Sequence, residues 1–474
     1  MATLQSELAV TRAELAAARA ELVAARAELV ELKAQLAKNS QNSSKPPSSD
    51  LPGTRPAKPK GRKRRKRGGQ PGHAAHQAVV PEHVDHLHLV RATHCGNCQA
   101  DLATAEPTGS VDHYVYELPP IRPLVHQFQC LDLACGRCGR VTPAPLPPGV
   151  PKGQYDPSVQ AMTALLRGEL RQSVRQTSAV MTQVMHVPMS PAMVAKTQQK
   201  VSEALAPAVA EAMHYAQNHR RPHADETSWP LDKKKGWLWV AVCGLVTVFI
   251  IRASRGADAA QQLLGKCVDR ILVTDRWGAY SWVSTKGRQL CWSHLKRDFK
   301  SFLDYGQEAQ RLGEQLLCQV RRMFRGWHKV RDGTWSRARF QQEMKPVRRR
   351  ILALLEEGRA MPCRKVRGMC KHILGLQDAL FTFVDNEGVE PTNNAAERAL
   401  RFAVLWRKGS FGSDSVGGSQ FVERILTVRA TLRSQKRDLY AYLKDACTAA
   451  LLGVPPPSIL PISEQNVTPL ALAA

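Results

Sequence analysis

The sequence predicts a multidomain α/β protein, and three observations support this fold class. The chain has 474 residues, more than one ordinary domain, and 43% of them are hydrophobic, enough to bury several cores. Between residues 221 and 412, β-branched and aromatic runs alternate with segments of helical periodicity. The first 38 residues repeat with a period of seven, which is typical of a coiled coil. We therefore expect a mixed-sheet core with separate modules before it.

The composition is strongly basic. Sixty-seven Lys and Arg residues oppose 41 Asp and Glu residues, which gives a formal net charge of +26 at pH 7. Nucleic acid is the expected partner, because cations that neutralise phosphates release condensed counterions. The alternative is a solvated basic surface without a specific ligand.

The sequence does not predict contact with a membrane. Its first forty residues are charged and heptad-patterned, so no secretory signal is expected. The longest apolar run, WLWVAVCGLVTVFII, has about 15 residues, fewer than the ~20 that a membrane helix needs. We expect a cytoplasmic protein whose twelve cysteines serve as thiols and metal ligands rather than as disulfides.

Residues 1–38 are expected to form a leucine-zipper coiled coil. If the heptad leucines occupy the a positions, glutamates fall at g and basic residues at e, so each g Glu faces an e Arg of the partner helix. This pattern predicts a parallel homodimer or a higher oligomer. A lone alanine-rich helix is the alternative, because small residues at d weaken the seam. The heptad leucines are Leu8, Leu15, Leu22, Leu29 and Leu36.

Residues 39–78 are expected to be a flexible linker that ends in a basic arm. Ser, Asn and Pro interrupt every periodicity in KNSQNSSKPPSSDLPGTRPAKPK. The arm suits a role in following phosphates or entering a minor groove, although a solubilising tract has the same composition. Its candidate DNA-binding residues are Arg62, Lys63, Arg64, Arg65, Lys66 and Arg67.

Residues 79–150 contain two short cysteine motifs, CGNC and CGRC, and are expected to form a zinc-binding module. Each motif places two thiolates on a tight turn, and two such turns supply the four ligands of a structural Zn²⁺ site. The predicted ligands are Cys95, Cys98, Cys135 and Cys138. Free thiols are the alternative, and Cys130, His94 and His126 compete as ligands because the motifs lie unusually far apart.

Residues 151–220 are expected to be helical, with a break at HVPMSP. Ser190 is a suitable N-cap and Pro191 a suitable first-turn residue, so a helix is expected to begin there. Two helices around a short turn resemble a helix-turn-helix DNA-binding unit. A packing unit without DNA contacts is the alternative.

Residues 221–412 are expected to form the α/β catalytic domain. A first strand in HADETSW is followed by a hairpin around Gly244, a short helix, a strand that ends at Asp275, and a strand that leads into the helix of CWSHLKRDF. A basic helical insertion at about 306–375 precedes a last helix, for which Thr392 and Asn393 are capping candidates. The order β-β-β-α-β-(α)-β-α is the ribonuclease H-like arrangement. Residues 413–474 are expected to be helices and a disordered tail.

Three acids stand at suitable places in this arrangement. Asp225 lies on the first strand, Asp275 at a strand end and Glu397 on the helix after the insertion. Oxygen ligands of this kind hold two Mg²⁺ ions that activate the attacking oxygen and stabilise the leaving oxygen of a phosphodiester. Glu226 rivals Asp225, but alternation sends neighbours to opposite faces of a strand. The ordinary alternatives are a strand-end cap, a turn residue and a helical pair of Glu397 with Arg401.

The sequence resembles the bacterial transposases of the insertion-sequence-66 family over nearly its whole length. The resemblance rests on NSSKPPSSD, GGQPGH, the cysteine motifs, HADETSW, VTDRWGAY, CWSHLKRDF, PTNNAAERALRFAVLWRKGSFG and FVERILTVRATLRSQKRD, in this order. It implies a DDE-type recombinase with Asp225, Asp275 and Glu397 as its acids and Mg²⁺ as cofactor. The implied substrates are element ends and target DNA, with possible accessory proteins of the same element, and the implied home is the bacterial cytoplasm, at the nucleoid when bound to DNA.

Further basic residues near these acids are candidates for phosphate contacts. Exposed helix charges, and a hydrogen bond in the core for the histidine, are the ordinary alternatives. The candidates are His294, Lys296, Arg401, Arg407 and Lys408.

Two other functions fit part of the same pattern. A non-catalytic DNA-binding regulator would use the zipper, arm and zinc module while the acids cap strands. A ribonuclease H-like nuclease would cleave DNA but give no joined product. Cleavage that depends on metal and on Asp275 distinguishes the first, and strand transfer the second.

Overall fold

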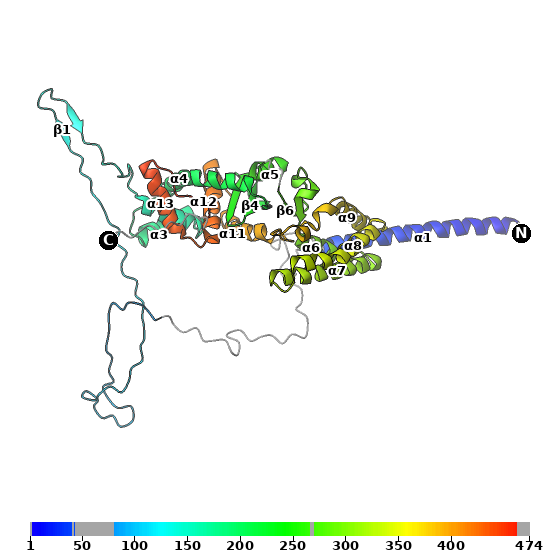
Figure 1. Cartoon of the computed structure of the whole chain (residues 1–474), viewed down its shortest axis with the longest axis horizontal. Helices are drawn as coiled ribbons and strands as arrows, with labels where there is room; N and C mark the ends of the chain where they lie inside the picture. Colours follow the sequence, from blue (N-terminus) through cyan, green and yellow to red (C-terminus); the bar gives the residue numbers. More distant parts are fainter. Residues whose placement is uncertain (1, 40–41, 43–79, 266–269, 462–474) are drawn as a thin grey trace. The chain divides into compact units, whose positions relative to one another are not determined.

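The computed structural model describes residues 2–39, 42, 80–265 and 270–461 (Figure 1). The chain divides into a smaller unit, Arg55–Pro123, and a larger one made of Met1–Thr54 and Leu124–Ala474. The basic arm and nearly all of the linker lie outside the described residues. Within the smaller unit, residues 80–123 contain an isolated antiparallel bridge, His94 to Asp101, and neither a helix nor a longer strand.

The predicted N-terminal helix is α1 (Ala2–Leu36). Its heptad leucines are exposed where their side chains are described, with Leu15 at 52%, Leu22 at 52% and Leu29 at 53%. Ala34, in contrast, is buried, and α1 contacts the short helix η4 (Phe302–Asp304) of the same unit. Ala34 stands at heptad position f, opposite the a and d positions, so the leucine seam stays exposed.

A small hairpin and three helices precede the main sheet. Strands β1 (Asp132–Ala134) and β2 (Val141–Pro143) pair antiparallel. Helices α2 (Pro157–Gly168), α3 (Val174–Gln183) and α4 (Pro191–Asn218) follow. As predicted, Ser190 caps α4, and its hydroxyl accepts a hydrogen bond from Met193 N. The sequence analysis missed the break before α3, where Ser173 and Gln176 form a capping box.

The main sheet of the described residues has five strands in the order β5-β4-β3-β6-β7. Strands β3, β4 and β5 form an antiparallel meander, whereas β6 and β7 lie parallel to β3. Gly244, with φ of 63°, makes the tight turn of the predicted hairpin. The strands are β3 (His223–Ser228), β4 (Trp237–Cys243), β5 (Val246–Arg252), β6 (Leu272–Thr274) and β7 (Arg288–Leu290), with helix α5 (Ala257–Leu264) between β5 and β6.

The largest core joins this sheet to α2, α4, α5 and three C-terminal helices. These are α11 (Asn394–Ser410), α12 (Val416–Ser434) and α13 (Leu439–Leu452). In Figure 1, α12 and α13 lie beside α4, far from it in sequence. The sequence predicted a disordered tail after α13, but residues 454–461 pack on the core, because Ile459 is fully buried and its carbonyl accepts a hydrogen bond from Gln435.

A second core belongs to the predicted helical insertion and continues to the sheet through Val273 and Leu290. The segment runs through α6 (Trp292–Ser301), η4, α7 (Gln307–Arg331), α8 (Arg337–Arg359), α9 (Arg364–Leu374), η5 (Gln377–Ala379) and α10 (Thr382–Asp385). Its two ends meet, because Trp292 N donates a hydrogen bond to Pro391 O at 2.9 Å. Of the helices described, none combines the length and apolar character that a membrane span requires.

Candidate active site

Strand β3 presents Asp225 to the face of the sheet that α11 covers. Side chains alternate along a strand, so Asp225 shares its face with Thr227 and not with Glu226. Arg407 of α11 donates a hydrogen bond to Thr227 Oγ1 at 3.0 Å, which identifies this face. At the other end of α11, Asn393 Nδ2 donates to the carbonyl of Ala224 at 2.7 Å. These contacts fix the helix against the strand that carries Asp225.

Glu226 is engaged on the opposite face of β3. Its Oε1 accepts hydrogen bonds from Arg255 Nε at 3.0 Å and Nη2 at 2.8 Å, and its Oε2 accepts one from the Tyr280 hydroxyl at 2.9 Å. Burial raises the pKa of Glu226, Asp275 raises it further, and Arg255 opposes the change. These three hydrogen bonds from Arg255 and Tyr280 hold the Glu226 carboxylate within the scaffold, whereas Asp225 has no such contacts to these two residues.

Asp275 follows β6 directly, where the buried run of that strand ends. Its Oδ1 accepts a hydrogen bond from Trp277 N at 2.8 Å, which holds the carboxylate at the start of the turn. The buried Arg288 lies behind it and donates to the carbonyl oxygen of Asp275 at 3.2 Å. The Asp275 backbone is therefore held at the strand end from two directions.

Electrostatic coupling shows that the three predicted acids lie near one another. The pKa of Asp225 is raised well above its usual value, first by burial and then by Glu226, Asp275 and Glu397. Such an effect requires these negative charges to approach the Asp225 carboxyl through a poorly solvated space. The three carboxyls are thus electrostatic neighbours, but within the described residues their oxygens do not form a group closer than 4.8 Å, whereas the ligand atoms of Glu397, Cys291 and His294 do.

Glu397 lies in the first turn of α11 and faces α6. Its Oε1 is 3.5 Å from His294 Nδ1 and 3.9 Å from Arg297 Nη2. The predicted alternative, a helical pair with Arg401, is not among the ion pairs of the described residues, and Arg401 is exposed. Glu397 Oε1 is buried without a hydrogen-bond partner within the described part of the chain.

The sequence analysis missed Cys291 as a neighbour of Glu397 and gave His294 and Asn393 other roles. Cys291, the last residue before α6, is buried, and its thiol accepts a hydrogen bond from Asn393 N at 3.1 Å. Asn393 was predicted as a capping residue, but its side chain makes no cap hydrogen bond because it bonds to β3 instead. Ligand atoms of Cys291, His294 and Glu397 all lie within 4.8 Å of one another. The C-x-x-H spacing at a strand-to-helix junction was the available signal.

The three acids suit a hard divalent cation. Carboxylate oxygens are the ligands that Mg²⁺ prefers, and an unpartnered Glu397 oxygen near crowded negative charge is what such an ion would satisfy. Asp225, Asp275 and Glu397 are therefore candidate ligands for such an ion.

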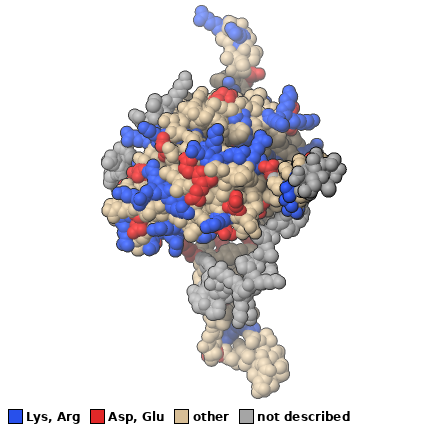
Figure 2. Space-filling model, turned by 90° about the vertical axis from the view of Figure 1, so that its right-hand side faces the viewer, with Lys and Arg blue, Asp and Glu red and all other residues tan. Residues whose placement is uncertain are grey.

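The predicted phosphate contacts have different surroundings. Lys296, Arg401 and Lys408 are exposed, whereas His294 is largely buried beside Glu397. Arg407 is bound to β3 through Thr227 and Ser228, so part of its guanidinium is already engaged. Figure 2 shows Lys and Arg side chains over much of the face that it presents, with Asp and Glu among them. The arm residues Arg62, Lys63, Arg64, Arg65, Lys66 and Arg67 lie outside the described residues.

The cysteine motifs belong to different units, Cys95 and Cys98 to the smaller and Cys135 and Cys138 to the larger. Each motif closes a tight turn, in which Cys95 N donates to Ala100 O at 2.9 Å and Cys135 N to Arg140 O at 2.9 Å. Backbone amides lower the pKa of the first thiol of each motif, those of Cys98 and Asn97 for Cys95 and those of Arg137 and Cys138 for Cys135. Each turn thus favours a thiolate, the form that binds Zn²⁺.

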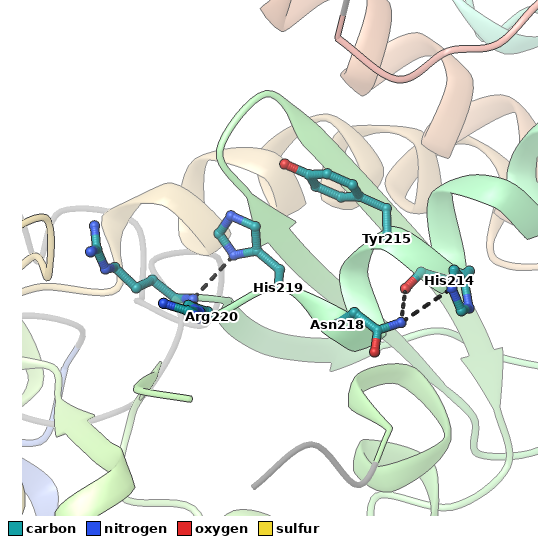
Figure 3. Close-up of a pocket in the computed structure, with 6 residues that line it drawn as sticks. His214, Tyr215, Asn218, His219 and Arg220 are labelled. Carbon is teal, nitrogen blue, oxygen red and sulfur yellow. Dashed lines mark hydrogen bonds between the residues drawn. The ribbon is translucent and has the colours of Figure 1, made fainter. Parts of the chain in front are cut away.

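A pocket at the C-terminal end of α4 contains none of the predicted site residues. Figure 3 shows its lining, in which Asn218 Nδ2 donates to the carbonyl of His214 at 2.8 Å. Arg221 N donates to His219 Nδ1 at 3.2 Å. Burial lowers the pKa of His219, and the charge of Arg221 adds to this effect. No carboxylate lines this pocket, so it offers nothing to the acids described above. The lining residues are His214, Tyr215, Asn218, His219, Arg220 and Arg221.

Two family profiles and a relative of known sequence match parts of this chain. The profile of a family of unknown function (DUF6444) matches residues 2–79. An uncharacterized protein of Sinorhizobium fredii, y4qI, is 27% identical over 285 residues, which are 53% of this chain and 52% of the relative. The match thus spans about half the length of that protein. The profile of the transposase IS66 family matches residues 152–421, a range that includes Asp225, Asp275 and Glu397. The chain therefore belongs to the IS66 family of transposases.

Proposed function

We propose that this protein is a DDE-type DNA transposase that binds the ends of its insertion sequence and catalyses metal-dependent cleavage and strand transfer. The observation that carries the proposal is the match of residues 152–421 to the transposase IS66 family, a range in which Asp225 lies on β3, Asp275 directly after β6 and Glu397 on α11. The strand order β5-β4-β3-β6-β7, with its antiparallel meander and two parallel strands, supports a ribonuclease H-like core.

The proposed reaction is an in-line attack by water on a phosphodiester at the element end, which frees a 3′-hydroxyl that then attacks target DNA. Asp225, Asp275 and Glu397 would hold two Mg²⁺ ions, which supply activation of the attacking oxygen and stabilisation of the leaving oxygen. The chain itself positions these carboxylates: β3 fixes Asp225, the Trp277 amide orients Asp275, and α6 faces Glu397. Positioning and charge make a nucleophilic side chain unnecessary.

DNA is the proposed substrate and partner. Beyond Lys296, Arg401 and Lys408, the insertion helices expose several arginines that would meet a phosphate backbone. The basic arm and the α3–α4 unit remain further proposed contacts. The exposed arginines of α7 and α8 include Arg321, Arg322, Arg325 and Arg349.

We further propose a homodimer or higher oligomer through α1, a structural Zn²⁺ held by the cysteine motifs, and accessory proteins from the same element. The exposed leucine seam of α1 supports the first of these, and the amide-stabilised thiols support the second. A cytoplasmic location, at the nucleoid when bound to DNA, follows from the proposed substrate.

Replacement of Asp275 by Asn tests the catalytic assignment. We expect Asp275→Asn to lower Mg²⁺-dependent cleavage of end-containing DNA at least about 100-fold, because loss of groups that merely orient metal ligands already costs 10–100-fold. Asp445→Asn is the matched control, since Asp445 is exposed on α13, and it is expected to cleave normally. Cleavage is measured on labelled DNA with and without Mg²⁺.

Two outcomes would point to the other functions. Equal cleavage by Asp275→Asn and the wild type would remove the catalytic role and favour a DNA-binding regulator. Metal-dependent cleavage that never yields a joined product would favour a nuclease.

A further inference from the structure

A second group of ligands adjoins the proposed oxygen site and differs from it in chemistry. Cys291 Sγ, His294 Nδ1 and Glu397 Oε1 offer one sulfur, one nitrogen and one oxygen, all within 4.8 Å of one another. Cys291 and His294 are three residues apart at the start of α6, so the first turn of this helix brings them to one side. Glu397 reaches them from α11, more than a hundred residues later in the chain.

The hydrogen-bonding state of these atoms is unusual for a buried position. His294 Nδ1 and Glu397 Oε1 are both buried and, within the described residues, neither has a hydrogen-bond partner, although they lie 3.5 Å apart. Unpartnered buried polar atoms destabilise a fold, so a pair of them at one place indicates a site for a ligand. Two of them converge on one buried thiol.

The remaining contacts hold the three side chains in place for binding a metal ion. Burial raises the pKa of the Cys291 thiol to about 11, and the hydrogen bond that Asn393 N donates to Cys291 Sγ opposes this change without outweighing it. Asn393 itself is fixed to β3 through Ala224, so the residues before α11 hold Cys291 and Glu397 in one rigid frame. A ligand set of one thiolate, one imidazole and one carboxylate is typical of Zn²⁺ and unsuited to Mg²⁺.

We propose that Cys291, His294 and Glu397 form a Zn²⁺ site with three protein ligands and an open fourth position. On binding, the ion replaces the thiol proton, which passes to solvent, and no redox step is involved. The site is separate from the one predicted at the cysteine motifs. Glu397 belongs to both proposed sites, so bound Zn²⁺ is expected to compete with the oxygen site for the Glu397 carboxylate.

The test is the zinc content of the full-length protein after equilibration with buffered free Zn²⁺, measured by elemental analysis. Cys291→Ser and His294→Ala are each expected to bind one ion fewer per chain than the wild type. Cys318→Ser is the matched control, because Cys318 is an exposed thiol on α7, and it is expected to match the wild type. If Cys291→Ser fails to fold, as judged by circular dichroism, the partly exposed His294→Ala and Glu397→Gln carry the test.

Asp225→Asn separates this proposal from the proposed function. Asp225 belongs to the oxygen site alone, so Asp225→Asn is expected to keep the full zinc content while losing cleavage. Wild-type zinc content in Cys291→Ser, His294→Ala and Glu397→Gln together would overturn the zinc site. Loss of an ion in Asp225→Asn but not in Cys291→Ser would also overturn it, because the ion would then lie at the oxygen site.

A kinetic consequence depends on the proposed function as well. Added Zn²⁺ is expected to inhibit Mg²⁺-dependent cleavage, and the half-inhibitory concentration is expected to rise about tenfold or more in His294→Ala, as for other losses around a metal ion. Equal inhibition of both proteins, with wild-type zinc content in the variant, would contradict the shared role of Glu397.

Discussion

At the residue scale, Asp225 has the least favourable surroundings of the three acids. Burial raises its pKa, the charges of Glu226, Asp275 and Glu397 raise it further, and its Oδ1 accepts a hydrogen bond from the amide of Glu226. In metal-free protein the folded state therefore binds more protons than the unfolded state from about pH 4 upward, where an ordinary Asp ionises. The free energy of unfolding is expected to fall as the pH rises through this window, until Asp225 ionises in the folded state.

Asp225→Asn tests this cost. At neutral pH without divalent ions, the variant is expected to be more stable than the wild type by about 0.5–2 kcal/mol, because it removes a carboxyl whose ionised form is disfavoured by burial and by the neighbouring acids. Its stability is also expected to depend less on pH above about 4. Denaturant unfolding at several pH values, with Asp445→Asn as control, measures both effects. If the variant were less stable than the wild type at neutral pH, the prediction that burial and the neighbouring acids make Asp225 destabilising would be wrong.

The same residues show what sequence reasoning can reach at this scale. Strand alternation predicted that only one of Asp225 and Glu226 can face the metals, and the Glu226 carboxylate is engaged by Arg255 and Tyr280. The grouping of Cys291 and His294 with Glu397 was not predictable, because it depends on how the long insertion returns its chain to α6. The local periodicity of a sequence does not predict where the chain returns after a long insertion.

At the element scale, α12 closes the edge of the sheet. Its residues Glu423, Thr427 and Thr431 stand four apart, a spacing of about 6 Å along a helix, and alternate residues of a strand are about 6.7 Å apart. Their side-chain oxygens accept hydrogen bonds from the amides of Ile251, Phe249 and Thr247 on β5, at 2.6, 3.0 and 3.0 Å. The unpaired amides of an edge strand are thereby satisfied.

Thr427→Val tests this closure with a nearly isosteric change. The amide of Phe249 would lose its partner in a buried place, so the free energy of unfolding is expected to fall by about 1–3 kcal/mol. Thr448→Val on α13 is the control, because the Thr448 hydroxyl bonds only to its own helix at Lys444 O, and a change within about 0.5 kcal/mol is expected. Both are measured by denaturant unfolding, and equal effects would contradict a specific role for α12.

Local sequence patterns predicted which segments are helices and strands, but predicted less often where these elements begin and end. The hairpin at Gly244 and the cap at Ser190 were predictable because one turn residue or one hydroxyl decides each. The break before α3 was missed because a capping box outweighs helical periodicity there. The hydrogen bond of the Asn393 side chain to β3, which replaces the expected helix cap, was missed because it depends on a contact with a distant strand. The hydrogen bonds between α12 and β5 could not be predicted from the sequence, since they join segments far apart in the chain.

At the scale of the whole molecule, α1 uses opposite sides for different purposes. Its side with Ala34 is buried near η4 of the same chain, and Asn42 Nδ2, just beyond the helix, donates to Asp304 Oδ2 at 3.1 Å. The leucine side is left exposed, so a second copy of α1 can pair with it without displacing these contacts.

The variant Leu15→Glu/Leu22→Glu tests the pairing. Two charges in the seam are expected to dissociate the oligomer and lower the mass measured by sedimentation, because a positions must be apolar. Ala13→Glu/Ala20→Glu places the same charges at f positions and is expected to leave the mass unchanged. An unchanged mass in the leucine variant would exclude the zipper.

The meeting of the two ends of the insertion has a consequence for how related chains can be compared. Trp292 and Pro391 are hydrogen-bonded neighbours. The segment between them therefore leaves the sheet and returns to it at the same place. The number of residues between Asp275 and Glu397 therefore does not determine the distance between their carboxylates. Loops inside this lobe can lengthen or shorten without disturbing either acid, provided that its helices still cover Val273 and Leu290.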